Sequence, residues 1–221
     1  MKILVACEFS GKVRDAFIEK GHNAWSCDFL EAEGKYKDRH VQGNVLELLH
    51  HHRWDWCGYE KWDMLIAFPP CTYLCSSGLH WNKRVEGRQE KTEEALKFVG
   101  ALLDADIPKI ALENPVGCIS TRIRKYDQMI HPYQFGDDAS KRTCLWLKGL
   151  PKLENTNYFP PRIVKGGKYD GKQRWGNQLD SGHNYLAPSP TRAKVRSTTY
   201  DGIAKAMADQ WGSLQTITVG G

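Results

Sequence analysis

Apolar residues recur along the chain with two spacings, one that suits buried strands and one that suits amphipathic helices. Short apolar or alternating runs predict four strands, at residues 2–7, 23–27, 62–68 and 109–112. Apolar positions three and four residues apart predict helices over residues 12–20 and 88–106, each lying between two of these strands. Strands that alternate with helices indicate an α/β fold with a mostly parallel sheet.

The later part of the chain departs from this alternation. Residues 129–135 and 143–147 have the pattern of two strands joined by a Gly-Asp-Asp turn, which predicts an antiparallel hairpin at one edge of the sheet. Residues 200–211 place apolar side chains on one helical face. We therefore expect the last helix to pack back onto the sheet.

Length and composition favour one main domain with an inserted segment, because 221 residues suffice for one good core. No apolar run approaches the roughly 18 residues that suggest a membrane span, and the apolar stretch near the N-terminus is too short for a signal peptide. The seven cysteines are odd in number and lack paired spacing, which favours reduced thiols over a disulfide framework. We expect a cytoplasmic protein with no membrane partner.

Residues 62–78 combine a buried strand with a reactive side chain. The apolar run should stop at Pro69, because two consecutive prolines fix the backbone and remove two N–H donors. Cys71 is the first reactive side chain beyond them. Ligands of open α/β sheets collect outside the carboxyl ends of strands, which is where this thiol is expected. The alternative is an inert Cys71 packed under a loop as a small hydrophobe.

A carboxylate follows the next predicted strand. Glu113 comes directly after residues 109–112, so it should reach the same sheet edge as Cys71. A thiol and a carboxylate at neighbouring strand ends form a more specific pair than either group alone. The alternative roles for Glu113 are a helix N-cap and an exposed turn. We also expect Pro115 to stop its strand, as Pro69 does.

The first part of the sheet resembles a nucleotide-binding unit. A turn at Phe9, Ser10 and Gly11 joins the first strand to the first helix. Asp28 follows the second strand, where a carboxylate can accept hydrogen bonds from ribose hydroxyls. Asn44 opens the third segment and offers an amide to an adenine edge. A dinucleotide-dependent dehydrogenase is disfavoured, because no G-x-G-x-x-G follows the first strand.

Positive charge is concentrated in residues 151–196. The whole chain has a net charge of +5, and residues 155–196 of this segment include eight basic residues: Arg162, Lys165, Lys168, Lys172, Arg174, Arg192, Lys194 and Arg196. Aromatic side chains, glycines and prolines are interspersed among them, as expected of a loop-rich surface that contacts phosphates and stacks on bases. A solvated loop is the alternative. We predict a basic substrate-recognition segment over 151–196, attached to a catalytic domain of residues 1–150 and 197–215.

The histidines at 50–52, followed by Cys57, raise the question of a metal site. Three adjacent histidines cannot all point the same way on a helix, and no second Cys/His pair has ligand spacing. Cys71 and Cys75 are likewise unsupported as a zinc pair. We predict no metal, and a solvated helix end for the histidine run.

These motifs together resemble the cytosine-C5 DNA methyltransferases. The sequence PPCTYLCSSG at 69–78 is similar to that family's proline-proline-cysteine loop, and ENP at 113–115 resembles its glutamate-asparagine-valine motif. The two occur in the family's order and at about its separation. The resemblance covers residues 2–150 and the last helix. The short recognition segment is typical of small phage or prophage forms.

Weaker motifs also resemble parts of that family. The opening CEFSG, Asp28 and the tripeptide Gly-Asn-Val at 43–45 are similar to three cofactor motifs, with fewer glycines and with Asn where the family usually has Asp. Lys141 and Arg142, which precede a strand, resemble the family's arginine motif without its two-arginine spacing. The expected target-recognition domain is reduced here to about the basic segment.

The resemblance implies a Rossmann-like class I fold and transfer of a methyl group from S-adenosylmethionine to C5 of cytosine in DNA. Cys71, with a lowered pKa, would add to C6 of the base. Glu113 would either supply a proton to N3 or hold N3 and the exocyclic amine, and Arg142 or Lys141 would stabilise O2. A base in duplex DNA would have to be flipped out. The implied cofactor residues are Phe9, Ser10, Gly11, Asp28, Asn44 and Phe68. The implied substrate residues are Pro70, Ser77, Asn114, Lys141, Lys165, Lys168, Lys172 and Arg174.

Two further interpretations stay open. The short recognition segment is compatible with the same chemistry on RNA or on a free pyrimidine nucleotide, although the basic segment favours a polymer. The other is a non-catalytic nucleic-acid-binding relative, which the presence of both Cys71 and Glu113 disfavours. Neither the recognised sequence nor any protein partner can be inferred from these motifs.

Overall fold

A seven-stranded sheet with the order β3-β2-β1-β4-β5-β7-β6 forms the centre of the computed structural model. The structure describes residues 1–50, 61–186, 189 and 192–214. The strands of the sheet are β1 (Lys2–Ala6), β2 (Asn23–Asp28), β3 (His40–Gln42), β4 (Met64–Ala67), β5 (Lys109–Pro115), β6 (Gln128–Ile130) and β7 (Thr143–Lys148). The five strands from β3 to β5 are parallel.

The register of the parallel strands brings their carboxyl ends to one edge. Ala6 of β1 lies opposite Cys27 of β2 and Ala67 of β4, and Ala67 lies opposite Leu112 of β5. The residues that follow these positions therefore leave the sheet side by side, in accordance with the rule that ligands bind beyond strand carboxyl ends.

β7 runs antiparallel between β5 and β6. This arrangement confirms the predicted α/β fold class, a mostly parallel, Rossmann-like sheet with an antiparallel hairpin at one edge. The first strand of the hairpin is shorter than predicted, because Pro132 begins the 3-10 helix η3 (Pro132–Gln134). The predicted stop at Pro115 is confirmed, because Pro115 is the last residue of β5. The strand predicted over residues 109–112 extends to this proline, which pairs with Thr143, and a proline is tolerated at the end of a ladder.

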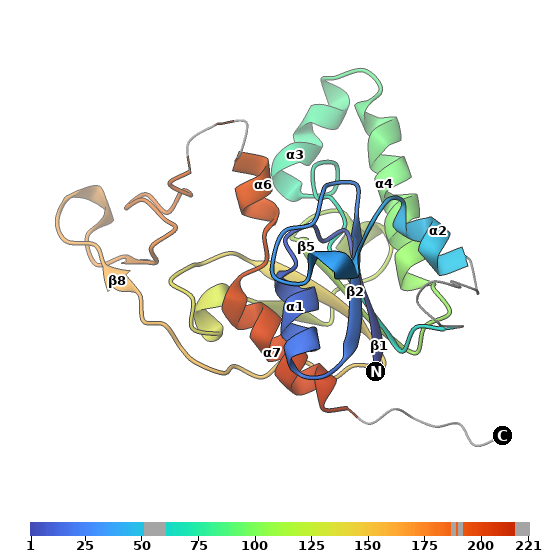
Figure 1. The fold of residues 1–221 in the computed structure, drawn as a ribbon. Helices are drawn as coiled ribbons and strands as arrows, with labels where there is room; N and C mark the ends of the chain where they lie inside the picture. The colour runs from blue at the N-terminus through green and yellow to red at the C-terminus, as the bar shows by residue number, and fades with distance from the viewer. Residues whose placement is uncertain (51–60, 187–188, 190–191, 215–221) are drawn as a thin grey trace.

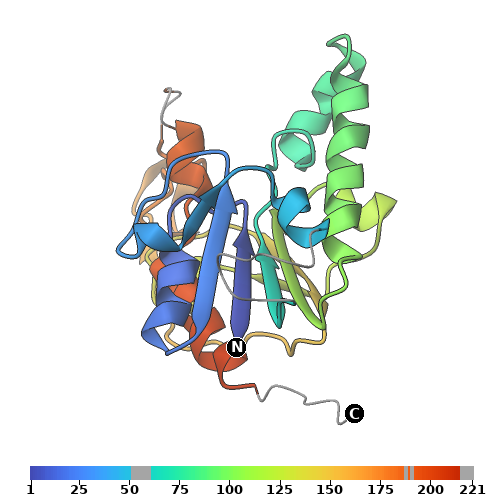
Figure 2. The same cartoon turned by 45° about the vertical axis from the view of Figure 1, so that its right-hand side comes forward.

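Helices cover both faces of the sheet (Figures 1 and 2). The α-helices are α1 (Lys12–Glu19), α2 (Val45–His50), α3 (Ser76–Leu79), α4 (Arg88–Leu103), α5 (Ile119–Arg122), α6 (Arg192–Ser197) and α7 (Asp201–Gly212). α1 and α7 bury Phe17 and Trp211 against Ile3 and Val5 of β1. α2 and α4 pack on the opposite face, which carries Leu4. β1 is apolar on both faces because both are covered.

The predicted helix over residues 200–211 is confirmed as α7, and it packs on α1 as well as on the sheet. The helix predicted over 88–106 ends earlier, at Leu103. Short 3-10 helices complete the structure: η1 (Lys37–Arg39), η2 (His80–Lys83) and η4 (Gly167–Tyr169). None of the helices in the described ranges has both the length and the apolar character that a membrane span requires.

The basic segment contains a two-stranded ribbon of β8 (Arg162–Ile163) and β9 (Gln173–Arg174), followed by α6. It lies beside the hairpin (Figure 1). Trp175 stacks on the Tyr133 ring with 4.2 Å between ring centroids, and Asn177 exchanges hydrogen bonds of 2.9 and 3.0 Å with the backbone of Ser140. These contacts attach the segment to the loop that precedes β7.

Candidate active site

The loop that carries Cys71 leaves the sheet from β4 and is tied to β5. The Nδ2 of Asn114, only 1% exposed, donates a 2.8 Å hydrogen bond to the carbonyl oxygen of Pro69. The next turn folds back on itself, because the Leu74 and Cys75 amides both donate to the Cys71 carbonyl at 3.0 Å. A buried side chain of β5 therefore fixes the path of the loop on which Cys71 lies.

Glu113 and Lys141 face each other at this edge. The Nζ of Lys141 lies 3.9 Å from Oε1 of Glu113, and the two side chains are 28% and 15% exposed. The charges of both residues act on the pKa of Cys71. Three segments distant in sequence, the β4 loop, the end of β5 and the start of β7, thus bring a thiol, a carboxylate and an ammonium group together.

Arg142 takes a different position from Lys141. Its side chain is exposed, and its charge acts on His131 and Cys144. Within the described residues, the cation paired with Glu113 is Lys141. The geometry therefore favours Lys141 over Arg142 as the cationic partner of the carboxylate.

Cys71 and Cys75 form a hydrogen-bonded thiol pair. The bond from Cys71 lowers the pKa of Cys75, which also contacts the Ser77 hydroxyl at 3.3 Å. The same bond, followed by burial and the charge of Glu113, raises the pKa of Cys71. The raised pKa of Cys71 is contrary to the lowered pKa expected from the sequence.

The other predicted substrate residues of this loop differ in exposure. Pro70 and Ser77 are exposed. Asn114 is buried, and its Nδ2 supports the loop through the hydrogen bond to Pro69. The role of Asn114 in holding Pro69 is therefore structural.

A cavity of about 720 Å³ opens between the hairpin and the basic segment. It is lined by residues that include Pro115, Lys141, Arg142, Asn177, Tyr185 and Arg196. Lys141 is thus shared by the cavity and the Glu113 contact. A group bound in the cavity would lie next to the ammonium group of Lys141, which faces Glu113.

The turn after β1 is closely packed. Phe9 and Ser10 are each 5% exposed, and Gly11 has a φ of 73°, in the left-handed region that favours glycine. The Phe9 ring lies beneath the ammonium of Lys194, 5.2 Å from its centroid, and Lys194 also pairs with Glu33 at 2.5 Å. Helix α6 of the basic segment therefore covers the turn predicted to contact a cofactor.

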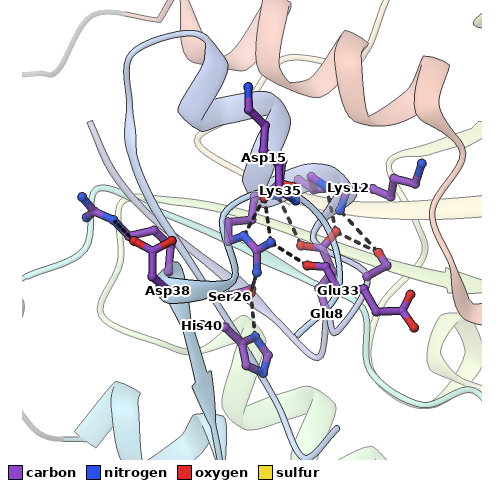
Figure 3. A network of polar contacts seen from close by, with 12 residues as sticks. Glu8, Lys12, Asp15, Ser26, Glu33, Lys35, Asp38 and His40 are labelled. Atoms are coloured by element: carbon purple, nitrogen blue, oxygen red, sulfur yellow. Dashed lines mark hydrogen bonds and ion pairs between the residues drawn. The ribbon is translucent and has the colours of Figure 1, made fainter. Parts of the chain in front are cut away.

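A buried polar network supports this turn (Figure 3). The Glu8 carboxylate is 4% exposed and accepts hydrogen bonds from the backbone amides of Val13 and Arg14 at 2.7 and 3.2 Å. Burial raises the pKa of Glu8 to about 7, although these bonds favour the ionised form. Glu8 thus occupies the N-terminus of α1, which in nucleotide-binding folds commonly receives a phosphate.

Arg14 is completely buried and links the turn to β2 and β3. Its guanidinium donates to the Ser26 hydroxyl at 2.9 Å and to the Glu33 carbonyl at 2.8 Å. Ser26 in turn contacts Nδ1 of His40 at 2.8 Å. His40 Nε2 donates to the Leu30 carbonyl at 3.0 Å, which assigns Nδ1 as the acceptor. The sequence pattern gave no indication of this network.

The remaining predicted cofactor residues lie at the same sheet edge. Asp28 ends β2, and its Oδ1 accepts a 2.9 Å bond from the Leu30 amide. Asn44 precedes α2, and its Oδ1 accepts a 3.1 Å bond from the Leu46 amide, as a helix cap does. Phe68 follows β4, and its amide donates to the Ala6 carbonyl at 2.9 Å. The register of β1, β2 and β4 gathers Phe9, Asp28 and Phe68 at one edge.

The predicted DNA-contacting residues of the basic segment separate into two kinds. Lys165, Lys168 and Lys172 are exposed. Arg174 instead holds its own loop, because its Nε donates to the Asp180 carbonyl at 2.9 Å. The three lysines are therefore the residues best placed to meet phosphates.

The described residues contain no group of three or more His, Cys, Asp or Glu side chains that could hold a metal ion. Histidines 51 and 52 and Cys57, which prompted the question of a metal, lie outside the described residues.

Comparison of the sequence with models of protein families and with curated proteins found no match. Comparison with solved structures found similarity to a provisionally assigned DNA modification methyltransferase encoded within an E. coli prophage. The two chains are 14% identical with a TM-score of 0.43, and the match covers 66% of this chain and 46% of the other. The chain thus spans less than half of that protein. Function is therefore inferred from the site itself.

Proposed function

We propose that this protein transfers a methyl group from S-adenosylmethionine to C5 of cytosine in DNA, through a covalent bond between Cys71 and C6 of the base. The observation that carries the proposal is the meeting of Cys71, Glu113 and Lys141 near the carboxyl ends of β4 and β5. Each group matches one requirement of the reaction. C5 of cytosine is a poor nucleophile until another group has added at C6.

The cofactor site fits a ligand that carries no phosphate. Glu8 already satisfies the Val13 and Arg14 amides at the start of α1, so a pyrophosphate would meet a carboxylate there. S-adenosylmethionine has no phosphate, and its ribose hydroxyls suit the Asp28 carboxylate. The residues that would hold it are Phe9, Ser10, Gly11, Asp28, Asn44 and Phe68. When bound, it supplies an electrophilic methyl group.

The thiol pair accounts for activation of the nucleophile. As the sulfur of Cys71 bonds to C6, its proton passes to the Cys75 thiolate, to which it is already hydrogen-bonded. Glu113 holds N3 and the exocyclic amine of the base, and Lys141 stabilises the charge that develops at O2. C5 then takes the methyl group. Loss of the C5 proton to water breaks the sulfur–C6 bond, and Cys75 returns its proton to Cys71.

DNA is the substrate that the basic segment favours. Its exposed lysines include Lys165, Lys168 and Lys172, and the cavity beside Lys141 lies between it and the sheet. A cytosine in duplex DNA would reach Cys71 only after flipping out of the stack. A steep loss of affinity with added salt is expected of such a polymer-binding surface.

The test is incubation of the protein with radiolabelled S-adenosylmethionine and matched samples of duplex DNA, single-stranded DNA, RNA and free cytidine nucleotides. We expect label in duplex DNA at C5 of cytosine. Cys71→Ala should abolish labelling and still bind the cofactor, because the thiol does not hold it. Labelling of RNA or nucleotides alone would show that DNA is not the substrate, and turnover by Cys71→Ala would exclude the covalent mechanism.

A further inference from the structure

We propose that residues 76–91, here called the arm, form a second DNA-contacting element in which Trp81 stacks against a base. The arm comprises α3, η2 and the first turn of α4. The inference rests on the proposed function, since it names a further contact with the same DNA. From the sequence, residues 76–78 were expected in the loop that carries Cys71, with Ser77 as a substrate residue, and residues 88–91 in a packed helix.

The arm lies beside the candidate active site. It follows Cys71 and Cys75 directly in the chain and projects from the sheet at the end where the parallel strands finish (Figure 2). The basic segment and α6 lie on the other side of that end (Figures 1 and 2). DNA with a base near Cys71 would therefore lie between the basic segment and the arm.

The arm exposes a large aromatic side chain among cations. Trp81 is 45% exposed, and the neighbouring Val85 is 48% exposed. The guanidinium of Arg84 lies 5.8 Å from the Trp81 ring centroid, and the His80 ring is 4.9 Å away. Lys83 and Arg84 are both exposed. An aromatic face flanked by cations is the combination that binds bases and phosphates together.

Internal hydrogen bonds hold the arm in a fixed position relative to Cys71. Asn82, next to Trp81, donates from Nδ2 to the Thr92 hydroxyl at 2.9 Å. Thr92 is buried, and its hydroxyl donates to the Tyr73 carbonyl at 3.1 Å.

A second connection reaches the same loop. The guanidinium of Arg88 donates to the Thr72 carbonyl at 3.1 Å and lies 4.9 Å from the Tyr73 ring centroid. A base stacked on Trp81 would therefore press on the segment that positions the thiol. The arm can thereby couple DNA contact to the placement of Cys71.

The charges of the arm favour a polyanion. Its basic residues are Lys83, Arg84, Arg88 and Lys91, against Glu86 and Glu90. The net charge of the arm is positive, as is that of the basic segment across the site. DNA is favoured over an apolar protein partner, because the exposed apolar side chains are set among these charges instead of forming a continuous apolar face.

The test measures duplex DNA affinity by fluorescence anisotropy for Trp81→Ala, Trp81→Phe and Lys83→Ala/Arg84→Ala. Trp81→Ala should weaken binding about 5- to 150-fold, the range for loss of one base–aromatic stack, and Trp81→Phe should retain most of the affinity. The double variant should reduce the salt slope by about 2. Ile123→Ala, another exposed apolar residue, and Lys97→Ala, another exposed cation of α4, are the controls.

Methyl transfer by the unchanged protein is measured in the same samples. If that protein binds and methylates DNA, and Trp81→Ala binds within twofold of it or loses no more affinity than Ile123→Ala, the arm proposal is wrong and the proposed function stands. If Trp81→Ala weakens binding as expected while the unchanged protein transfers no methyl group, the arm is a DNA contact and the methyltransferase proposal fails. Absence of DNA binding by the unchanged protein contradicts both.

Discussion

Asn114→Asp tests how far the buried end of β5 governs the Cys71 loop. Asn114 is almost fully buried and donates a 2.8 Å hydrogen bond from Nδ2 to the Pro69 carbonyl. The substitution preserves the size of the side chain but replaces the donor nitrogen with an acceptor oxygen. Two acceptors would then face each other, two residues before the proposed nucleophile.

The expected loss of stability follows from this one hydrogen bond. A buried carbonyl left without its donor costs about 1–3 kcal/mol. With a urea dependence of about 2 kcal/mol per molar, the midpoint of unfolding should fall by about 1 M at alkaline pH. Displacement of the thiol by about 1 Å should lower methyl transfer about 100-fold. The exposed Asn155→Asp carries the same charge change and should leave both quantities unchanged.

The effect should depend on pH in a defined direction. Burial and the facing carbonyl should raise the pKa of the new carboxyl group above its unfolded value of about 3.9. The contribution of this carboxyl group to stability is then fully present below the unfolded pKa and is lost as pH rises through the folded pKa. Below about pH 4 the protonated carboxyl can donate to Pro69, so the deficit should shrink. An Asn114→Asp protein with the normal urea midpoint at alkaline pH would refute this reasoning.

Three further predictions concern protons and charge. Burial raises the pKa of Glu8 from 4.5 to about 7, so the contribution of Glu8 to stability is present below pH 4.5 and is lost as pH rises through 7. The difference in unfolding free energy between the unchanged protein and Glu8→Gln should therefore change by about 3 kcal/mol over this range. A difference in denaturant melts that does not depend on pH would contradict this prediction. Cys75 should be alkylated at lower pH than Cys71. Cys71→Ala should raise the pKa of Cys75, because the substitution removes the hydrogen bond that lowers this pKa most. Mass spectrometry of peptides alkylated across a pH series measures both effects, and an unshifted Cys75 profile in Cys71→Ala would disprove the thiol pair. Neutralising Lys165, Lys168 and Lys172 of the basic segment should reduce the salt slope of DNA binding by about 3, with little change in thermal stability. An unchanged slope would mean that these lysines do not contact DNA.

The sheet could be predicted because its signals are local. Each parallel strand is a short apolar run, and runs buried on both faces stand out from the helices between them. Strand pairing across the hairpin was harder to place. The apolar run ends at Leu112, but pairing with β7 extends β5 to Pro115, which lies opposite Thr143. The proline lacks a donor, and at the last position of the ladder this costs little.

The site could be predicted only in part, because its chemistry depends on contacts between distant residues. The positions of Cys71 and Glu113 at strand ends were visible in sequence. The choice between Lys141 and Arg142 was not, since two adjacent cations differ only in the direction of their side chains. The effect of Cys75 on the pKa of Cys71 was also missed, although the spacing of four residues between the two cysteines was a usable signal. The buried guanidinium of Arg14 had no sequence signal at all.

Covalent trapping tests the central claim most directly. An oligonucleotide with 5-fluorocytosine at the methylated position can accept the methyl group but cannot lose fluorine as it would a proton, so the sulfur–C6 bond should persist. With S-adenosylmethionine present, we predict a protein–DNA adduct resistant to denaturation, whose modified residue is identified by tandem mass spectrometry as Cys71. No adduct, or an adduct carried by Cys75, would contradict the proposed mechanism.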